Sequence, residues 1–289
     1  MFSLASLLIL TATVLPLALV GFLVYITVKY GPVVGRIFEN APVFRPLSAP
    51  PEPDREDVRF KASDGVELVG SYSRARTPTR AGTIVFCHEF LGDRFSVGPY
   101  AKGLRELGFD LFSFDFRNHG ESAVDPAYSP LQWVSDLEVR DLRAALAYVE
   151  TRTDSDPAGV ALFGVSRGGG TALIVAADSP KVWGVITDSA FPTYGTMKVY
   201  INRWAEIYVA RVSLWLWPNW FFQFAGWTGR MRTQWKRGRR YPVMERAVAK
   251  LAPRPWLMIH GACDNYIKTE IAQALFAKAK EPKDLWIVP

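Results

Sequence analysis

The chain has 289 residues, of which 49% are hydrophobic and 21% are charged, and its formal net charge is +6. This composition allows a sizeable core and excludes wholesale disorder, and the charge is too small for a histone-like protein. The two cysteines, Cys87 and Cys263, make no disulfide framework and form no metal cluster with the three histidines. We therefore expect one large domain or two small ones, without a metal site.

An apolar segment without any charged side chain runs from Met1 to Val28. It exceeds the roughly 20 residues that cross a bilayer core, so we predict a transmembrane anchor at residues 1–30. A cleaved signal peptide and a buried core helix are the alternatives, and a signal peptide would need a basic start and a small-residue cleavage site. No basic residue precedes the segment, whereas three follow it: Lys29, Arg36 and Arg45. The positive-inside rule therefore predicts a single-pass protein with a cytoplasmic globular part.

A proline-rich segment comes next. Residues 41–53 contain five prolines, a composition typical of an extended spacer. We therefore place a linker at residues 31–58 and a globular domain at residues 59–289.

The globular part alternates strand-like and helix-like segments. Strands are expected at 66–73, 83–88, 111–116, 160–165, 182–187 and 256–259, and helices at 100–107, 137–149, 171–177 and 271–279. This alternation predicts an α/β fold with a doubly wound, mostly parallel sheet. In such sheets ligands bind at the carboxyl ends of the strands.

A G-x-S-x-G motif, Gly164 to Gly168, lies between the strand expected at 160–165 and the helix expected at 171–177. Glycines beside a serine permit a sharp strand-to-helix turn that exposes the hydroxyl at a helix N-terminus. Ser166 is therefore a candidate nucleophile, and an ordinary turn is the alternative. Two other strand ends carry polar motifs: Cys87-His88-Glu89-Phe90-Leu91-Gly92 and Ile259-His260-Gly261-Ala262-Cys263-Asp264.

These motifs resemble the α/β-hydrolase superfamily, in particular its serine-aminopeptidase-like and esterase- or lipase-like branch. The resemblance extends from about Arg59 to the C-terminus and includes a loop similar to the family's D-x-R-x-H-G-x-S pattern, Asp115 to Ser122. We expect Asp115 and Arg117 in that loop to be structural. One departure is Glu89, which stands where the family usually has glycine.

The resemblance implies a role for four residues. Ser166 would be the nucleophile and Asp264 the acid that orients the base, while the backbone N–H groups of Phe90 and Arg167 would form the oxyanion hole. Asp188, at the end of the strand expected at 182–187, is the alternative acid.

The catalytic histidine is not found at its family position. In the family it follows the last strand, and here the sequence ends at Pro289, directly after a strand-like stretch. Because a serine hydroxyl is a poor nucleophile without a base, we expect this histidine beyond Pro289, in a longer chain. A natural pseudoenzyme is the alternative. The three histidines present have local structural explanations: His88, His119 and His260.

An insertion at about 191–241 is rich in aromatic and basic residues. Six of the ten tryptophans lie there, at 204, 215, 217, 220, 227 and 235. We expect a cap over the active site, with a second membrane span at 212–229 as one alternative. Nucleic-acid binding is the other, and no recognition fold supports it. Tryptophan beside lysine and arginine also suits a membrane surface.

These observations predict a membrane-anchored serine hydrolase that cleaves an ester or thioester through an acyl-enzyme on Ser166. No cofactor is expected. The expected partners are the lipid bilayer and a small acyl-ester substrate, not a nucleic acid. A serine peptidase is the alternative enzyme, and a catalytically dead membrane-associated protein is the alternative from another class.

Overall fold

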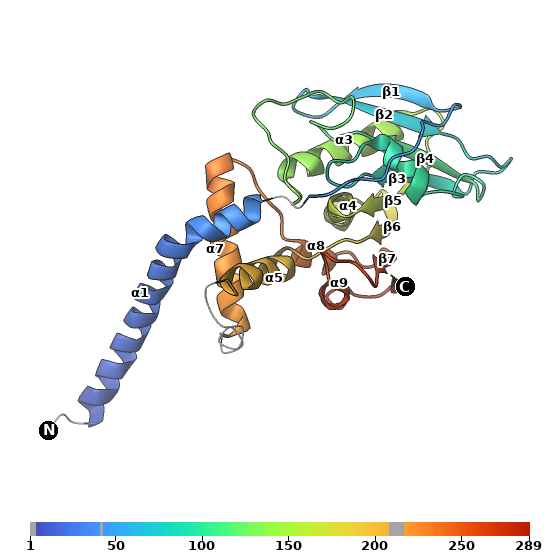
Figure 1. The fold of residues 1–289 in the computed structure, drawn as a ribbon. Coiled ribbons are helices and arrows are strands. Elements are labelled where there is room, and N and C mark those ends of the chain that lie inside the picture. The colour runs from blue at the N-terminus through green and yellow to red at the C-terminus, as the bar shows by residue number, and fades with distance from the viewer. Residues whose placement is uncertain (1–3, 41–42, 208–216) are drawn as a thin grey trace. The chain divides into compact units, whose positions relative to one another are not determined.

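The structure is a computed structural model that describes residues 4–40, 43–207 and 217–289 (Figure 1). Its internal contacts divide the chain into two compact units. One unit comprises Met1–Asn40 with Met197–Arg239, and the other comprises Ala41–Thr196 with Arg240–Pro289. All four residues with predicted roles in catalysis belong to the second unit, which we call the α/β unit.

The α/β unit is built on an eight-stranded sheet with the order β1-β2-β4-β3-β5-β6-β7-β8. The first strand pairs are antiparallel, and all pairs from β4–β3 to β7–β8 are parallel. This confirms the predicted fold class. The strands are β1 Glu56–Lys61, β2 Glu67–Ser73, β3 Gly82–Cys87, β4 Phe109–Phe114, β5 Val160–Val165, β6 Val182–Asp188, β7 Trp256–Gly261 and β8 Lys283–Val288.

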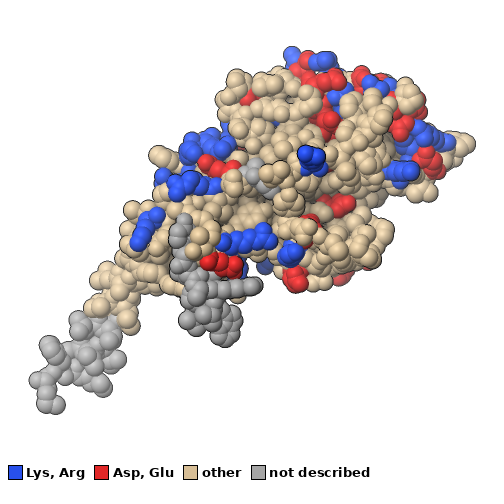
Figure 2. All heavy atoms as spheres, viewed as in Figure 1, with Lys and Arg blue, Asp and Glu red and all other residues tan. Residues whose placement is uncertain are grey.

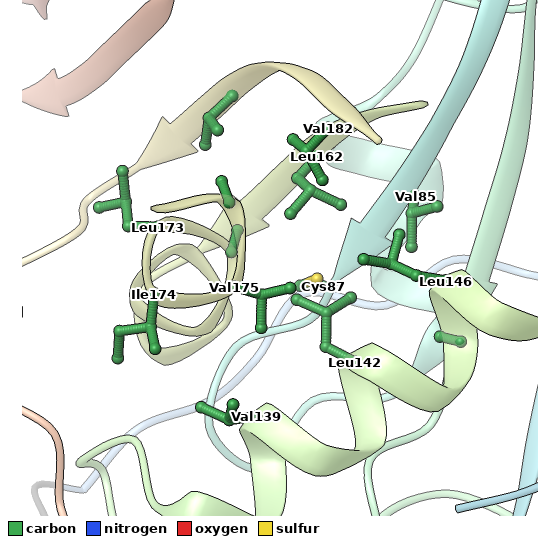
Figure 3. Close-up of a cluster of buried hydrophobic side chains, with 14 of the residues drawn as sticks. Val85, Cys87, Val139, Leu142, Leu146, Leu162, Leu173, Ile174, Val175 and Val182 are labelled. Atoms are coloured by element: carbon green, nitrogen blue, oxygen red, sulfur yellow. The ribbon is translucent and has the colours of Figure 1, made fainter. Parts of the chain in front are cut away.

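The central strands are buried on both faces because helices cover the sheet on two sides. Alternate residues of one strand enter different clusters, as the two-residue period of a strand requires. Val85 of β3 packs with residues of the helices α3 and α4, as Figure 3 shows, whereas its neighbours Ile84 and Phe86 enter the cluster on the other face. The helices and the short 3₁₀ turn of this unit are η1 Arg94–Ser96, α2 Val97–Tyr100, α3 Asp136–Thr151, α4 Arg167–Asp178, α8 Met244–Val248 and α9 Thr269–Phe276.

Two helical expectations differ in outcome. The helix expected at 137–149 is present as α3, and Ser135 and Glu138 form a reciprocal capping box at its start. The helix expected at 100–107 is absent, because residues 101–107 form turns after the short helix α2. Gly103 has a φ of 88°, a left-handed conformation that interrupts a right-handed helix.

The other unit contains the apolar helix α1 Leu4–Glu39, the helix α7 Asn219–Arg237 and most of α5 Thr193–Ala205. Among the described residues one helix is long and apolar enough to cross a bilayer, at Ala12–Glu39, with a mean hydropathy of 1.9. Only 6% of its most apolar window is buried, and a signal sequence near an N-terminus passes the same test. The helix continues past residue 30, where the sequence placed its end. Trp215 and residues 212–216 of the alternative second span lie outside the described residues.

Candidate active site

Ser166 occupies a strained turn between β5 and α4. Its φ of 51° and ψ of −115° are rare for a residue with a side chain. The flanking positions have no room for a side chain, because a Cβ atom on Gly164 would lie 2.4 Å from the backbone oxygen of Gly168. A Cβ atom on Gly168 would lie 2.1 Å from the backbone oxygen of Cys87. The motif therefore allows β5 to turn directly into α4 beneath the end of β3, with a half-buried Ser166 at the corner.

Backbone hydrogen bonds hold this corner in place. The Ser166 N–H donates to the backbone oxygen of Asp188 at 2.7 Å, and the Gly170 N–H donates to the Ser166 oxygen at 3.1 Å. The first N–H groups of a helix have no partner within it and carry the positive end of its dipole. Ser166 therefore stands at a point where a developing negative charge is stabilised.

The two predicted oxyanion amides belong to neighbouring strand ends. Arg167 is the first residue of α4, and Phe90 follows β3, which pairs with β5 up to Cys87 and Gly164. The close approach of Gly168 to the backbone of Cys87 and His88 brings the two turns together. The guanidinium of Arg167 also lies 5.2 Å from the centre of the Phe90 ring. The structure thus places both segments at the edge of the sheet where Ser166 lies.

The side chain of Arg167 is fully buried, a feature that the motif did not predict. It donates to the backbone oxygen of Leu131 and to Nε2 of His119, and lies 3.4 Å from the carboxylate of Glu138. Burial by itself raises the pKa of Glu138, but Arg167 and hydrogen bonds from Ser135 and Tyr128 bring that pKa below its ordinary value. The residue after the nucleophile is therefore fixed by a buried ion pair.

Both candidate acids lie at the same edge of the sheet. Asp264 follows β7, and its Oδ1 accepts hydrogen bonds from the Tyr266 and Ile267 N–H groups at 2.7 and 2.9 Å. Asp188 ends β6, and its Oδ1 accepts one from the Ser189 hydroxyl at 2.8 Å. Burial raises the pKa of Asp188. Asp188 thus ends the strand next to β5, and Asp264 follows the strand after that.

Each histidine ring already has local partners. His88 donates from Nδ1 to the backbone oxygen of Glu89 and accepts the Phe116 N–H at Nε2. His119 binds the backbone oxygen of Arg117 through Nδ1 and the Arg167 guanidinium through Nε2. Burial, followed by the Arg167 charge, lowers the pKa of His119 to about 4. The ring of His260 is buried and binds the backbone oxygen of Ile267 through Nε2.

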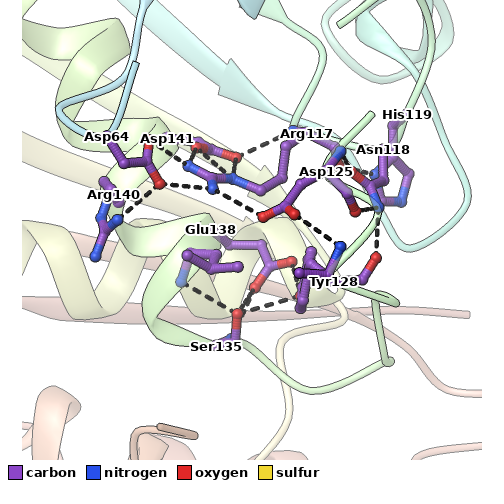
Figure 4. Close-up of polar contacts among 12 residues, drawn as sticks. Asp64, Arg117, Asn118, His119, Asp125, Tyr128, Ser135, Glu138, Arg140 and Asp141 are labelled. Atoms are coloured by element: carbon purple, nitrogen blue, oxygen red, sulfur yellow. Dashed lines mark hydrogen bonds and ion pairs between the residues drawn. The ribbon is translucent and has the colours of Figure 1, made fainter. Parts of the chain in front are cut away.

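The Asp115–Ser122 loop is held by two ion-pair clusters. Arg117 is fully buried and contacts Asp141 and Asp64, as Figure 4 shows. Asp115 accepts the backbone N–H of Arg94 and pairs with its guanidinium. Because Asp115 and Arg117 are engaged in these ion pairs, their role is structural: they hold the loop in place beside the site. No cluster of three or more metal-ligating side chains occurs in the part of the chain that the structure describes.

The proline-rich segment, which the sequence predicted as an extended spacer, forms hydrogen bonds to the α/β unit. We call residues Val43–Ala49 the strap. At one end the Tyr266 hydroxyl donates to the backbone oxygen of Val43, close to the Asp264 loop. At the other the Leu47 N–H donates to Oε1 of Glu89 at 3.1 Å, and the Ser96 hydroxyl donates to the Leu47 oxygen at 2.8 Å. The strap therefore joins the end of β7 to the end of β3.

The two attachment points of the strap follow strands that are not neighbours in the sheet. In the sheet order, β5 and β6 lie between β3 and β7. Ser166 and Asp188 lie at the ends of these two intervening strands. Glu89, the departure from the family pattern, is one of the three residues whose side chains hold the strap.

Comparisons with known proteins agree with this architecture. The family model described as alpha/beta hydrolase fold matches residues 82–234, so the chain belongs to the α/β-hydrolase family. The uncharacterized protein YfhR of Escherichia coli is 29% identical over 245 residues, which cover 83% of this chain and 74% of that protein. The quorum-quenching protein AidA of Acinetobacter baumannii is 32% identical over 136 residues, 47% of this chain and 43% of that protein.

A solved structure with the same fold is an esterase of Pyrococcus furiosus. It superposes with a TM-score of 0.61 at 19% identity and covers 87% of this chain and 88% of its own. At this identity the likeness concerns the fold. Together with the family match, these relatives support a hydrolase.

Proposed function

We propose that the protein is a serine hydrolase that cleaves an ester or thioester through an acyl-enzyme on Ser166. The observation that carries this proposal is the φ of 51° at Ser166, at a corner that glycines alone permit, between the turn of Phe90 and the start of α4. Strained non-glycine conformations persist where the surrounding structure enforces them, and they concentrate at functional sites.

In the proposed reaction the Ser166 Oγ attacks the carbonyl carbon of the substrate while a base takes its proton. The negative charge on the carbonyl oxygen is stabilised by the Phe90 and Arg167 N–H groups, and one such donor typically contributes about 3 kcal/mol. The leaving alcohol or thiol then takes the proton from the base. Water, activated by the same base, attacks the acyl carbon and releases the acid and free Ser166.

The proposed base is a histidine that follows Pro289, oriented by Asp264. Strand β8 runs parallel to β7, and the Ala262 N–H donates to the backbone oxygen of Val288 at 2.7 Å. A segment that continued from β8 would therefore start beside Ala262, which precedes Asp264 by two residues. This register supports Asp264 over Asp188 as the orienting acid.

The finer parts of the proposal concern substrate and location. The aromatic composition of residues 191–241 favours an acyl chain over the charged end of a peptide. Helix α1 would anchor the protein in a membrane as a single span, with the α/β unit in the cytoplasm because Lys29 and Arg36 follow the apolar stretch.

A fluorophosphonate probe tests the proposal. The gene is expressed to its natural stop codon, and the product is treated with the probe beside Ser166→Ala and a control, Ser179→Ala, just past the far end of α4. We expect labelling of the natural protein and of the control, and none of Ser166→Ala. If a histidine follows Pro289 and labelling is independent of Ser166, the proposal is wrong. If no histidine follows and no labelling occurs, the pseudoenzyme alternative replaces it.

A further inference from the structure

Helices α1 and α7 pack side by side and run in the same direction (Figure 1). Phe22 stacks on Trp217 just before α7 and contacts Phe221, at ring distances of 6.2 and 6.3 Å. Further along, a Cβ atom on Gly229 would lie 2.5 Å from Val34, so the backbones approach closely there. The insertion thus lies against the same helix that is apolar enough to span a bilayer.

Ion pairs join the two helices at their C-terminal ends. Glu39, the last residue of α1, accepts hydrogen bonds from Lys236 at 2.9 Å and from Arg237 at 3.3 Å. These two bonds join residues that are 197 and 198 positions apart in the chain. The register of α7 on α1 is therefore defined from Phe22 to Glu39.

The face of α7 away from this contact carries a line of large apolar side chains. Buried residues of α7 such as Phe222, Ala225 and Gly229 repeat at helical spacing and mark one side. At 100° per residue, four exposed residues lie on the opposite side. We call them the aromatic stripe, and their exposed fractions are Trp220 50%, Trp227 45%, Met231 38% and Trp235 86%. Contiguous exposed apolar surface of this kind marks an interaction site.

Two features identify the partner of the stripe. The stripe begins beside Phe22, within the stretch of α1 whose own apolar side chains are exposed, for example Leu17 at 69% and Val28 at 72%. Next to it on α1, the Lys29 ammonium donates to the Tyr25 hydroxyl and lies over the rings of Tyr25 and Tyr30. Tyrosine, tryptophan and lysine at the end of an apolar span are typical of the membrane–water interface.

The charge of the region specifies the lipid. No acidic residue occurs from 207 to 244, whereas the end of α7 and the turn after it hold six basic residues: Arg230, Arg232, Lys236, Arg237, Arg239 and Arg240. Figure 2 shows blue spheres over the C-terminal end of α7 and mostly tan spheres along α1 before it. Basic residues beside an apolar span attract anionic headgroups.

We propose that α7 is a second membrane-contacting element, which runs beside α1 through the headgroup layer of an anionic leaflet and places the aromatic stripe against lipid there. It contacts this leaflet without crossing it, since at 100° per residue Arg230 and Arg232 lie on either side of the stripe. The α1–α7 unit thereby fixes the insertion at the bilayer surface, independently of any catalysis at Ser166.

Spin labels on the full chain in nanodiscs test this proposal. In a Cys263→Ser background, Trp227→Cys and Met231→Cys are each labelled with a nitroxide, and Trp286→Cys on β8, which is 57% exposed, serves as the aqueous reference. Oxygen concentrates in lipid and a nickel chelate in water, so their relative effects on relaxation report immersion. In phosphatidylcholine–phosphatidylglycerol discs we compare the effect of oxygen on the relaxation of each label with that of the nickel chelate. We expect this oxygen-to-nickel ratio to be several-fold higher at positions 227 and 231 than at position 286.

Several results would overturn the proposal. A ratio at 227 and 231 equal to that at 286 places the stripe in water. Immobile labels that neither reagent reaches place it against protein, whether the rest of the chain or a second copy. Protection from nickel by added RNA in lipid-free detergent would indicate a nucleic-acid surface. The anionic requirement fails if discs of phosphatidylcholine alone, or Arg230→Gln with Arg232→Gln, leave the ratio unchanged.

Discussion

Glu89, which stands where the family usually has glycine, has a structural role in this protein. Its side chain is buried, Oε1 accepts the Leu47 N–H, and Oε2 has no hydrogen-bond partner among the described residues. Burial raises the pKa of this carboxyl. The folded state therefore binds the proton more tightly than the unfolded state does, and ionisation of Glu89 costs stability.

We expect Glu89→Gln to be more stable than the natural protein at pH 7, because the amide keeps an acceptor for Leu47 without carrying a charge. The pKa is raised on folding, so the favourable contribution of protonated Glu89 is present below the unfolded value of about 4.3 and lost as the pH rises through the folded value. The gain in the free energy of unfolding should thus shrink toward zero below about pH 4. Urea unfolding at several pH values measures this gain, and a gain that is constant with pH would contradict the raised pKa of Glu89.

Glu89→Leu, which accepts no hydrogen bond, should release the strap and speed hydrogen exchange at the Leu47 N–H.

Arg167 combines a predicted backbone role with a buried side chain. Arg167→Met leaves the Glu138 carboxylate buried without its cation, and we expect a loss of about 3 to 5 kcal/mol in the free energy of unfolding. Arg167→Met with Glu138→Gln should recover part of it. The exposed pair Arg59–Glu67 is the matched control, and Arg59→Met should cost less than about 1 kcal/mol. Equal losses in chemical unfolding for the two single variants would contradict the role of burial.

At the scale of elements, the contact of α1 with α7 depends on the absence of a side chain at Gly229. Gly229→Ala would place a methyl group 2.5 Å from Val34 and separate the helices. A disulfide between Glu39→Cys and Lys236→Cys in a Cys263→Ser background reports the pairing in membranes. We expect efficient cross-linking in the parent and a several-fold loss with Gly229→Ala. Gly21→Ala is the control, since nothing lies within 4 Å of its Cβ position. Undiminished cross-linking in Gly229→Ala would show that the helices do not need this close approach.

At the scale of the whole molecule, the division into two units predicts the effect of removing residues 1–30. The sheet and its hydrophobic clusters lie in the α/β unit, and Val34 and Glu39 remain to contact α7. We expect the shortened protein to unfold in one cooperative transition and to be extracted from membranes by alkaline carbonate, which removes proteins held only at the surface. Thermal unfolding followed by circular dichroism and a carbonate wash measure both. Resistance to carbonate would favour a second span in the insertion.

Local patterns were enough for much of the fold and for the position of Ser166. The two-residue and 3.6-residue periods define strands and helices within short windows, and a serine between glycines at a strand-to-helix junction requires a sharp turn whatever surrounds it. The apolar stretch from Met1 to Val28 indicates a helix of spanning length by composition alone. These features depend on neighbours in sequence, which is why one sequence sufficed.

Contacts between residues far apart in the chain were determined only by the tertiary structure. Leu47 meets Glu89 from 42 positions away, and Arg167 meets His119 from 48. Glu39 meets Lys236 from 197 positions away. A proline-rich strap, an arginine after a nucleophile and a glycine in a helix look the same in sequence whether exposed or packed. Their partners are selected by the sheet order and by burial, and these arise only when the whole chain folds.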